Sequence, residues 1–141
     1  MLTVLVGGAI AVAAQYLIRR IVNSSRRQKS LKHRCAEVLS TLEAYSDATR
    51  SAILASGEYS WDQRQYIEAV KALKRRRPPK KILQRLSNAD RRRIEVETIW
   101  ASTSPETRRS DQALHKSLLS YESTVESFAV EASIFIRLFV A

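Results

Sequence analysis

The sequence predicts an all-α fold in which an N-terminal single transmembrane helix continues into an antiparallel bundle of three to five helices with coiled-coil-like seams. The chain has 141 residues but only 3 glycines and 3 prolines, and so few helix breakers favour long helices over strands. Its opening run is uncharged and mostly apolar. Two later segments space apolar residues alternately three and four positions apart, which is the repeat of a helical seam.

The opening run predicts a transmembrane anchor over residues 1–22. Residues 2–18 carry no charge, and a bilayer core requires about 20 mostly apolar residues. Arg19 and Arg20 can extend to the lipid headgroups from the end of this run. Tyr16 lies where an interfacial aromatic residue is common.

Two alternatives explain the same run. Residues 11–13 resemble a signal-peptidase cleavage site, although no basic residue precedes the apolar run as it does in a signal peptide. The run can also be a core helix of a soluble bundle, either permanently or as a helix that is stored there and later inserts into a membrane. The anchor is the preferred interpretation.

A basic juxtamembrane segment follows over residues 23–34, and no acidic residue occurs before Glu37. Cytoplasmic flanks of membrane helices are enriched in Lys and Arg. We therefore expect the N-terminus outside, and the bundle domain, residues 35–141, in the cytoplasm or a virion interior. The residues predicted to lie at the membrane interface are Tyr16, Arg19, Arg20, Arg26, Arg27 and Lys29.

A second basic cluster lies over residues 71–93. The whole chain has 24 Lys and Arg against 14 Asp and Glu, a net charge of +10, and this segment alone has eleven basic residues and one acidic residue, Asp90. It is expected to contact a polyanion, an acidic protein or anionic lipid. It has no aromatic residue to stack on bases, so nucleic-acid binding would be sequence-nonspecific. The candidate polyanion-binding residues are Lys71, Lys74, Arg75, Arg76, Arg77, Lys80, Lys81, Arg85, Arg91, Arg92 and Arg93.

The first bundle helix is predicted from a seam that holds for about three heptads. No breaker precedes it as far back as Ile10, so the anchor can continue directly into it, with residues 23–25 the favoured place for a bend. Gly57 is the predicted C-terminal stop. The seam residues are Leu31, Cys35, Val38, Leu42, Tyr45, Thr49 and Ala52.

The second helix is expected to begin with a capping box, in which Ser60 is the N-cap and Gln63 is the third helical residue. It ends near Arg76, because two prolines follow. Its buried line is predicted to be Tyr66, Ile67, Val70 and Leu73, with Ala69 beside it.

A third helical stretch starts near Pro79 and runs to about Ala101. Residues 87–90 are either a kink or a new N-cap, so one bent helix and two short helices are both compatible with the sequence. The expected apolar positions are Ile82, Leu83, Leu86, Ile94, Val96, Ile99 and Trp100.

The fourth helix is predicted to start at Ser104, because a proline and an acidic residue follow this N-cap serine. If it packs antiparallel to the first helix, it returns to about the level of Arg20. Its seam residues are Leu114, Leu118, Tyr121, Val125, Phe128, Ala132, Phe135 and Phe139.

The sequence contains no motif for catalysis, phosphate binding or a cofactor, and we predict no catalytic, metal or cofactor site. His33 and Glu37 share a helix face, but an exposed pair at this spacing explains them more simply than a metal site. Cys35, the one cysteine, lies on the apolar seam and is expected to be a small core residue.

These observations predict a non-enzymatic single-pass membrane protein that acts as a structural scaffold or adaptor. Its partners would be membrane lipid and a polyanion or acidic protein, and its seams favour a homo-oligomer. One alternative is a membrane-permeabilising effector with a stored hydrophobic helix. The other is a soluble helical bundle that binds nucleic acid without sequence specificity.

Overall fold

The computed structural model describes the backbone of residues 2–140 and, within the helices, the side chains of residues 15, 17, 26 and 29–134. The described residues form four helices and no strand. This confirms the predicted all-α bundle. The helices are α1 (Leu2–Ala55), α2 (Gln63–Arg75), α3 (Lys80–Ser102) and α4 (Gln112–Val140).

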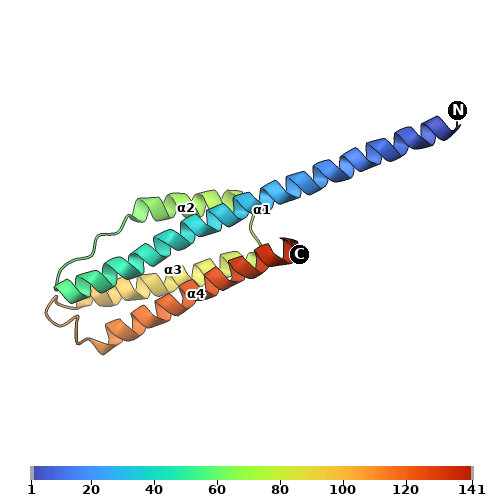
Figure 1. The fold of residues 1–141 in the computed structure, drawn as a ribbon. Coiled ribbons are helices and arrows are strands. Elements are labelled where there is room, and N and C mark those ends of the chain that lie inside the picture. The colour runs from blue at the N-terminus through green and yellow to red at the C-terminus, as the bar shows by residue number, and fades with distance from the viewer. Residues whose placement is uncertain (1, 141) are drawn as a thin grey trace.

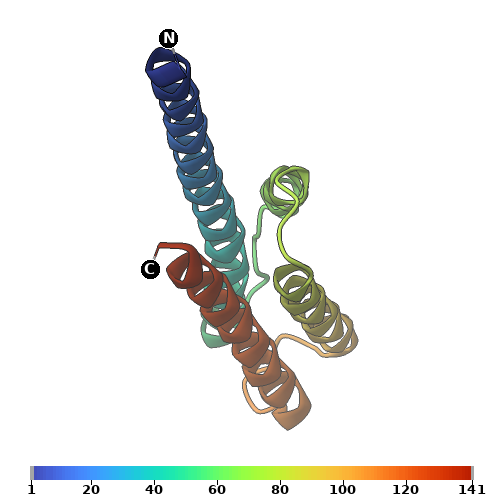
Figure 2. The same ribbon diagram turned by 90° about the vertical axis from the view of Figure 1, so that its right-hand side faces the viewer.

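Consecutive helices run in opposite directions, so the chain goes up and down through the bundle (Figure 1). Helix α3 packs along α4, and α1 packs against both α2 and α4 (Figure 2). The N-terminal part of α1 extends beyond the other three helices, and the end of α4 lies beside the middle of α1 (Figure 1). The second half of α1 therefore belongs to the bundle and the first half projects from it.

The predicted seams of α1 and α4 form most of the core. All seven seam residues of α1 are buried, as are the six described seam residues of α4, from Leu114 to Ala132. Phe135 and Phe139 lie outside the residues whose side chains are described. Tyr45 lies at the centre, where its ring makes edge-on contacts with the rings of Tyr59, Trp61 and Tyr121.

The buried faces of α2 and α3 differ from the prediction. Ile67 is 41% exposed and Ile94 is 49% exposed, so neither belongs to the core. Helix α3 is continuous, which settles the choice between one helix and two. The buried residues of α3 alternate three and four positions apart, although two of them, Ala89 and Arg93, are not large apolar residues. The buried residues of α3 are Ile82, Leu86, Ala89, Arg93, Val96 and Trp100.

Two predicted helix ends are displaced by a residue or two. The N-cap of α2 is Asp62 and not Ser60, because the Asp62 side chain accepts a hydrogen bond from the backbone N–H of Gln65 at 2.9 Å. Helix α1 turns at Ser56, whose φ of 54° is left-handed, and not at Gly57. The Gly57 N–H then bonds to the carbonyl of Ala52 at 3.0 Å, which closes the helix in a Schellman-type end.

Helix α4 starts at Gln112, eight residues after the predicted Ser104. Arg108 explains the difference, because its buried side chain holds residues 103–111 in an irregular turn. The guanidinium lies 3.9 Å from the ring centroid of Trp100 and donates to Glu58 and to the Trp100 carbonyl, both at 3.0 Å. One turn does form after Ser104, whose carbonyl accepts the backbone N–H groups of Thr107 and Arg108 at 3.1 and 3.2 Å, but it does not continue into α4.

The register between α1 and α4 is set by a salt bridge between Arg50 and Glu122. The Ser46 hydroxyl donates to the same carboxylate at 2.7 Å, and the Tyr121 hydroxyl donates to the Leu42 carbonyl at 2.6 Å. Because both helices rise by about 1.5 Å per residue, these three contacts place the end of α4 near the level of about residues 23–32 of α1. The predicted return to about the level of Arg20 is therefore too long by roughly one to three turns.

In the part of the chain whose side chains are described, no helix is long and apolar enough to cross a membrane. The predicted anchor, residues 1–22, falls almost entirely outside that part.

Candidate functional site

The predicted membrane-interface residues are only partly described. Arg26 and Lys29 are exposed on α1. The side chains of Tyr16, Arg19, Arg20 and Arg27 lie outside the described residues.

Most of the predicted polyanion-binding residues lie together at one corner of the bundle, where α2 ends and α3 begins. Helix α2 stops there because Arg77 takes a left-handed conformation with a φ of 49° and Pro78 follows it. Residues 76–79 join the two helices at the end of the bundle from which α1 projects (Figure 1). The short loop and the first turn of α3 thus concentrate charge at that end.

The tertiary structure brings this corner next to the basic segment of α1. Arg34 of α1 and Arg75 of α2 line the same groove, which has a volume of about 670 Å³. Glu37 and Glu68 also line it, and Arg34 donates to Glu37 at 3.1 Å. We call the following exposed residues the basic end of the bundle: Lys29, Lys32, Lys71, Lys74, Arg75, Arg76, Arg77, Lys80, Lys81 and Arg85.

The last three residues of the predicted cluster, residues 91–93, lie away from the basic end, and their side chains have three different surroundings. Arg91 is exposed and donates to Asn88 at 3.3 Å. Arg92 forms a salt bridge of 3.0 Å with Glu95 on the same helix. Arg93 is only 5% exposed and lies in the core. Its placement among polyanion-binding residues is therefore wrong.

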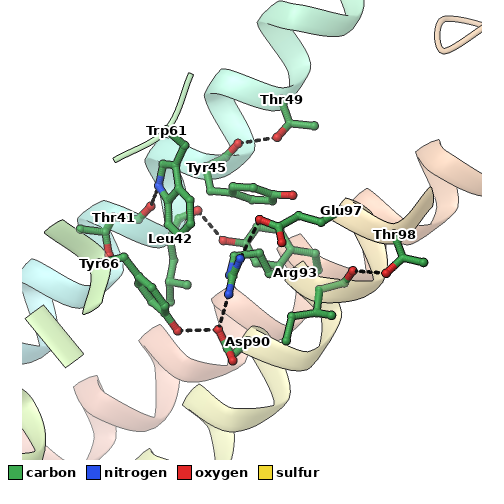
Figure 3. Close-up of polar contacts among 12 residues, drawn as sticks. Thr41, Leu42, Tyr45, Thr49, Trp61, Tyr66, Asp90, Arg93, Glu97 and Thr98 are labelled. Carbon is green, nitrogen blue, oxygen red and sulfur yellow. Dashed lines mark hydrogen bonds and ion pairs between the residues drawn. The ribbon is translucent and has the colours of Figure 1, made fainter. Parts of the chain in front are cut away.

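Arg93 is the centre of a polar cluster inside the bundle (Figure 3). Its guanidinium donates to Glu97 at 2.7 Å and to Asp90 at 2.9 Å, and both carboxylates come from α3. The hydroxyl of Tyr66 on α2 donates to the same Asp90 oxygen at 2.9 Å. The cluster thereby connects α2 with α3 through side chains.

Aromatic rings enclose the guanidinium. Its carbon lies 5.1 Å from the ring centroid of Trp61, 5.4 Å from that of Tyr66 and 6.0 Å from that of Tyr45. The electron-rich ring faces stabilise a cation in a site from which water is largely excluded. The Trp61 indole N–H bonds to the Thr41 carbonyl at 2.9 Å, which fixes its ring against α1 (Figure 3).

Burial and neighbouring charges keep Arg93, Tyr66 and Tyr45 in one protonation state at neutral pH. Burial lowers the pKa of the Arg93 guanidinium, but Asp90 and Glu97 raise it by more, so it lies above its ordinary value. Burial raises the pKa of Tyr66 and of Tyr45. Arg93 therefore stays charged and both tyrosines stay protonated, so the charge-assisted hydrogen bonds between α2 and α3 persist at neutral pH.

The sequence does not reveal the role of Arg93 directly, because a basic residue within a basic run predicts a position on the surface. The signal that identifies it is the spacing of α3, since positions 82, 86, 89, 93, 96 and 100 continue one seam. The acidic residues Asp90 and Glu97, three before and four after it, supply its partners.

The candidate metal and thiol groups have ordinary surroundings. His33 and Glu37 form an exposed pair with a 3.0 Å contact, and the described residues include no group of three potential metal ligands. Cys35 is 3% exposed, and burial raises the pKa of its thiol to about 11. The cysteine is therefore a protonated core residue, as the seam predicted.

Comparison of the chain with protein-family models, with curated protein sequences and with solved structures found no match.

Proposed function

We propose that this chain is a non-enzymatic single-pass membrane protein whose helical bundle lies with its basic end against an anionic membrane surface and acts there as a scaffold or adaptor. The observation that carries the proposal is the convergence of two basic segments, far apart in sequence, at the end of the bundle from which α1 projects (Figure 1). The apolar start of the sequence supports an anchor at that same end.

The charge of the basic end favours contact with an anionic membrane surface. A basic residue close to an anionic leaflet contributes about 1 kcal/mol, and the contribution falls off over about 8–10 Å at physiological salt. The loop between α2 and α3 contributes Arg76 and Arg77, and Lys80 and Lys81 follow on the first turn of α3. Even with incomplete contact, these four residues would supply roughly 2–4 kcal/mol toward holding the bundle at the surface.

The orientation follows from the same charges. Basic residues concentrate on the C-terminal side of the apolar run, and the positive-inside bias places such a flank in the cytoplasm or an equivalent compartment such as a virion interior. The bundle would then hold its basic end at the inner leaflet and its opposite end, with Glu58 and Asp62, toward the interior.

Extraction of membranes from expressing cells with alkaline carbonate tests the anchor, and a protease-protection assay on sealed vesicles tests the orientation. We expect the full chain to stay in the membrane pellet and the bundle to be cleaved only when the cytoplasmic side is accessible. A chain released by carbonate would overturn the anchor. Release of vesicle contents by such a soluble chain would favour the membrane-permeabilising alternative, and salt-sensitive binding to DNA or RNA would favour the nucleic-acid alternative.

Amide hydrogen exchange on the reconstituted full chain tests the role of the basic end. We expect residues 71–81 to exchange more slowly in vesicles that contain anionic lipid than in purely zwitterionic vesicles. The variant R76E/R77E should lose this difference. The variant R91E/R92E, with the same change of charge away from the basic end, should keep it. Equal exchange in both kinds of vesicle would refute contact between the basic end and lipid.

A further inference from the structure

An acid-rimmed groove lies between α1 and α4 and is not part of the basic end. It has a volume of about 320 Å³. Its apolar part includes Leu39 and Ala129, which are half-buried, and Val125, which is buried. A space of this size admits an aliphatic side chain together with the methylene stems of neighbouring long side chains.

Carboxylates line the rim of this groove in a chain whose net charge is +10. Glu122 already has partners, because Arg50 and the hydroxyl of Ser46 both bond to it and lower its pKa. Among the residues whose side chains are described, no cation forms a salt bridge with Glu43, Asp47 or Glu126 (Glu43 and Asp47 on α1, Glu126 on α4), and all three are exposed. The groove therefore offers three exposed carboxylates without a salt bridge around apolar side chains, and of these only Asp47 lies within electrostatic reach of Arg50.

The outer face of α2 has the complementary pattern. Arg64, Ile67, Lys71 and Lys74 follow one another at spacings of three, four and three, so they lie on one face of the helix. All four are exposed, and Ile67 is one of the large apolar side chains left outside the core. We call these four residues the α2 ridge. It presents one apolar side chain flanked by three cations.

We propose that the α2 ridge of one molecule docks into the α1–α4 groove of a second copy. Ile67 would enter the apolar part of the groove, and Lys71 and Lys74 would pair with Glu43 and Glu126 on its rim. Complementary charge sets the register of such a contact, and burial of the apolar side chain adds to its stability. The contact depends on neither the anchor nor the membrane orientation.

The geometry makes the assembly open-ended. The groove belongs to α1 and α4, and the ridge belongs to α2, which lies on the opposite side of the bundle from α4 in Figure 2. A contact between two different surfaces is heterologous, so each added molecule leaves a free groove at one end and a free ridge at the other. The molecules would thus form a lateral row or a closed ring, and not only a dimer.

A charge-exchange experiment on the full chain in mild detergent tests this contact. Variant E43K/E126K makes the groove basic, and variant K71E/K74E makes the ridge acidic. We expect each variant alone to self-associate at least tenfold more weakly than the wild type in sedimentation velocity at low salt, because its own two surfaces repel. An equimolar mixture should restore association, since each reversed surface then meets a complementary one.

Matched variants separate this effect from a general change in charge. Variant E95K/E106K reverses two acids outside the groove, and variant K80E/K81E reverses two bases outside the ridge. Both should associate like the wild type. Restored association in the mixture also shows that the charge-exchanged variants are folded. A wild type that stays monomeric at low salt, or a mixture that associates no better than its components, would overturn the proposal.

Discussion

Replacing Arg93 with alanine tests whether the polar cluster holds the bundle together. The substitution removes the cation that is shared by Asp90 and Glu97 and leaves a space among the rings of Trp61 and Tyr66. Breaking a buried ion pair by removing one partner costs about 3–5 kcal/mol. The two carboxylate side chains are 37% and 35% exposed, so water can hydrate them and the loss should be near the lower limit, about 3 kcal/mol.

A second variant, Arg93→Met, separates charge from packing. Methionine fills the volume of the arginine stem and is well tolerated among aromatic rings, but it makes no hydrogen bond to the carboxylates. We expect it to cost about half as much as the alanine substitution. The difference in the free energy of unfolding between the alanine and methionine variants then measures the cost of the cavity. The loss of stability in the methionine variant measures the contribution of the ion pairs.

Equilibrium unfolding in urea, followed by tryptophan fluorescence, gives both free energies, since the ring centroid of Trp61 lies 5.1 Å from the guanidinium carbon. A reduced midpoint with an unchanged slope would indicate a loss of stability within the same fold. An alanine variant within about 0.5 kcal/mol of the wild type would refute the placement of Arg93 in the core, because surface substitutions have effects of that size.

Three further predictions concern the helix end, the core tyrosines and acid stability. Ser56→Gly should stabilise the chain by about 0.5–1 kcal/mol, measured by urea unfolding, because glycine adopts the left-handed conformation at this position without strain; a destabilised variant would contradict that conformation. Tyr121→Phe should lower the free energy of unfolding by about 1 kcal/mol, because it removes a buried hydrogen bond. Tyr45→Phe should be neutral or stabilising, because the Tyr45 hydroxyl has no hydrogen-bond partner among the described residues. Equal losses of stability in the two variants would contradict this difference. Arg50 and Ser46 lower the pKa of Glu122, so this group contributes stability above its ordinary pKa of 4.5 that is lost as the pH falls through the lowered value. Glu122→Gln should therefore flatten the loss of stability below pH about 4.5, measured by thermal unfolding across pH, and an unchanged acid slope would exclude this contribution.

The charge-exchange and hydrogen-exchange experiments address different parts of the molecule. Lys71 and Lys74 belong both to the α2 ridge and to the basic end, whereas Arg76 and Arg77 belong only to the basic end. Self-association that survives in R76E/R77E, together with loss of lipid-dependent exchange, would show that the two surfaces act independently.

The sequence by itself determined the helical class and the two longest seams. Alternating spacings of three and four identify the buried face of a helix. Where the residues on that face are large and apolar, as at Leu42 and Phe128, this face can be predicted without knowing which helix packs against it. The buried cysteine followed from the same periodicity, because Cys35 stands on the seam.

Only the tertiary structure decided what happens to the charged residues. Arg93 is as basic as its neighbours Arg91 and Arg92, and it is buried because α3 turns that position toward Tyr45 and Tyr66 while Asp90 and Glu97 compensate its charge. The late start of α4 and the meeting of the two basic segments likewise depend on contacts between residues far apart in the chain, such as that of Arg108 with Glu58. Periodicity selects a face of each helix, but the partner that covers this face, and the charges that face one another, are fixed only when the helices pack.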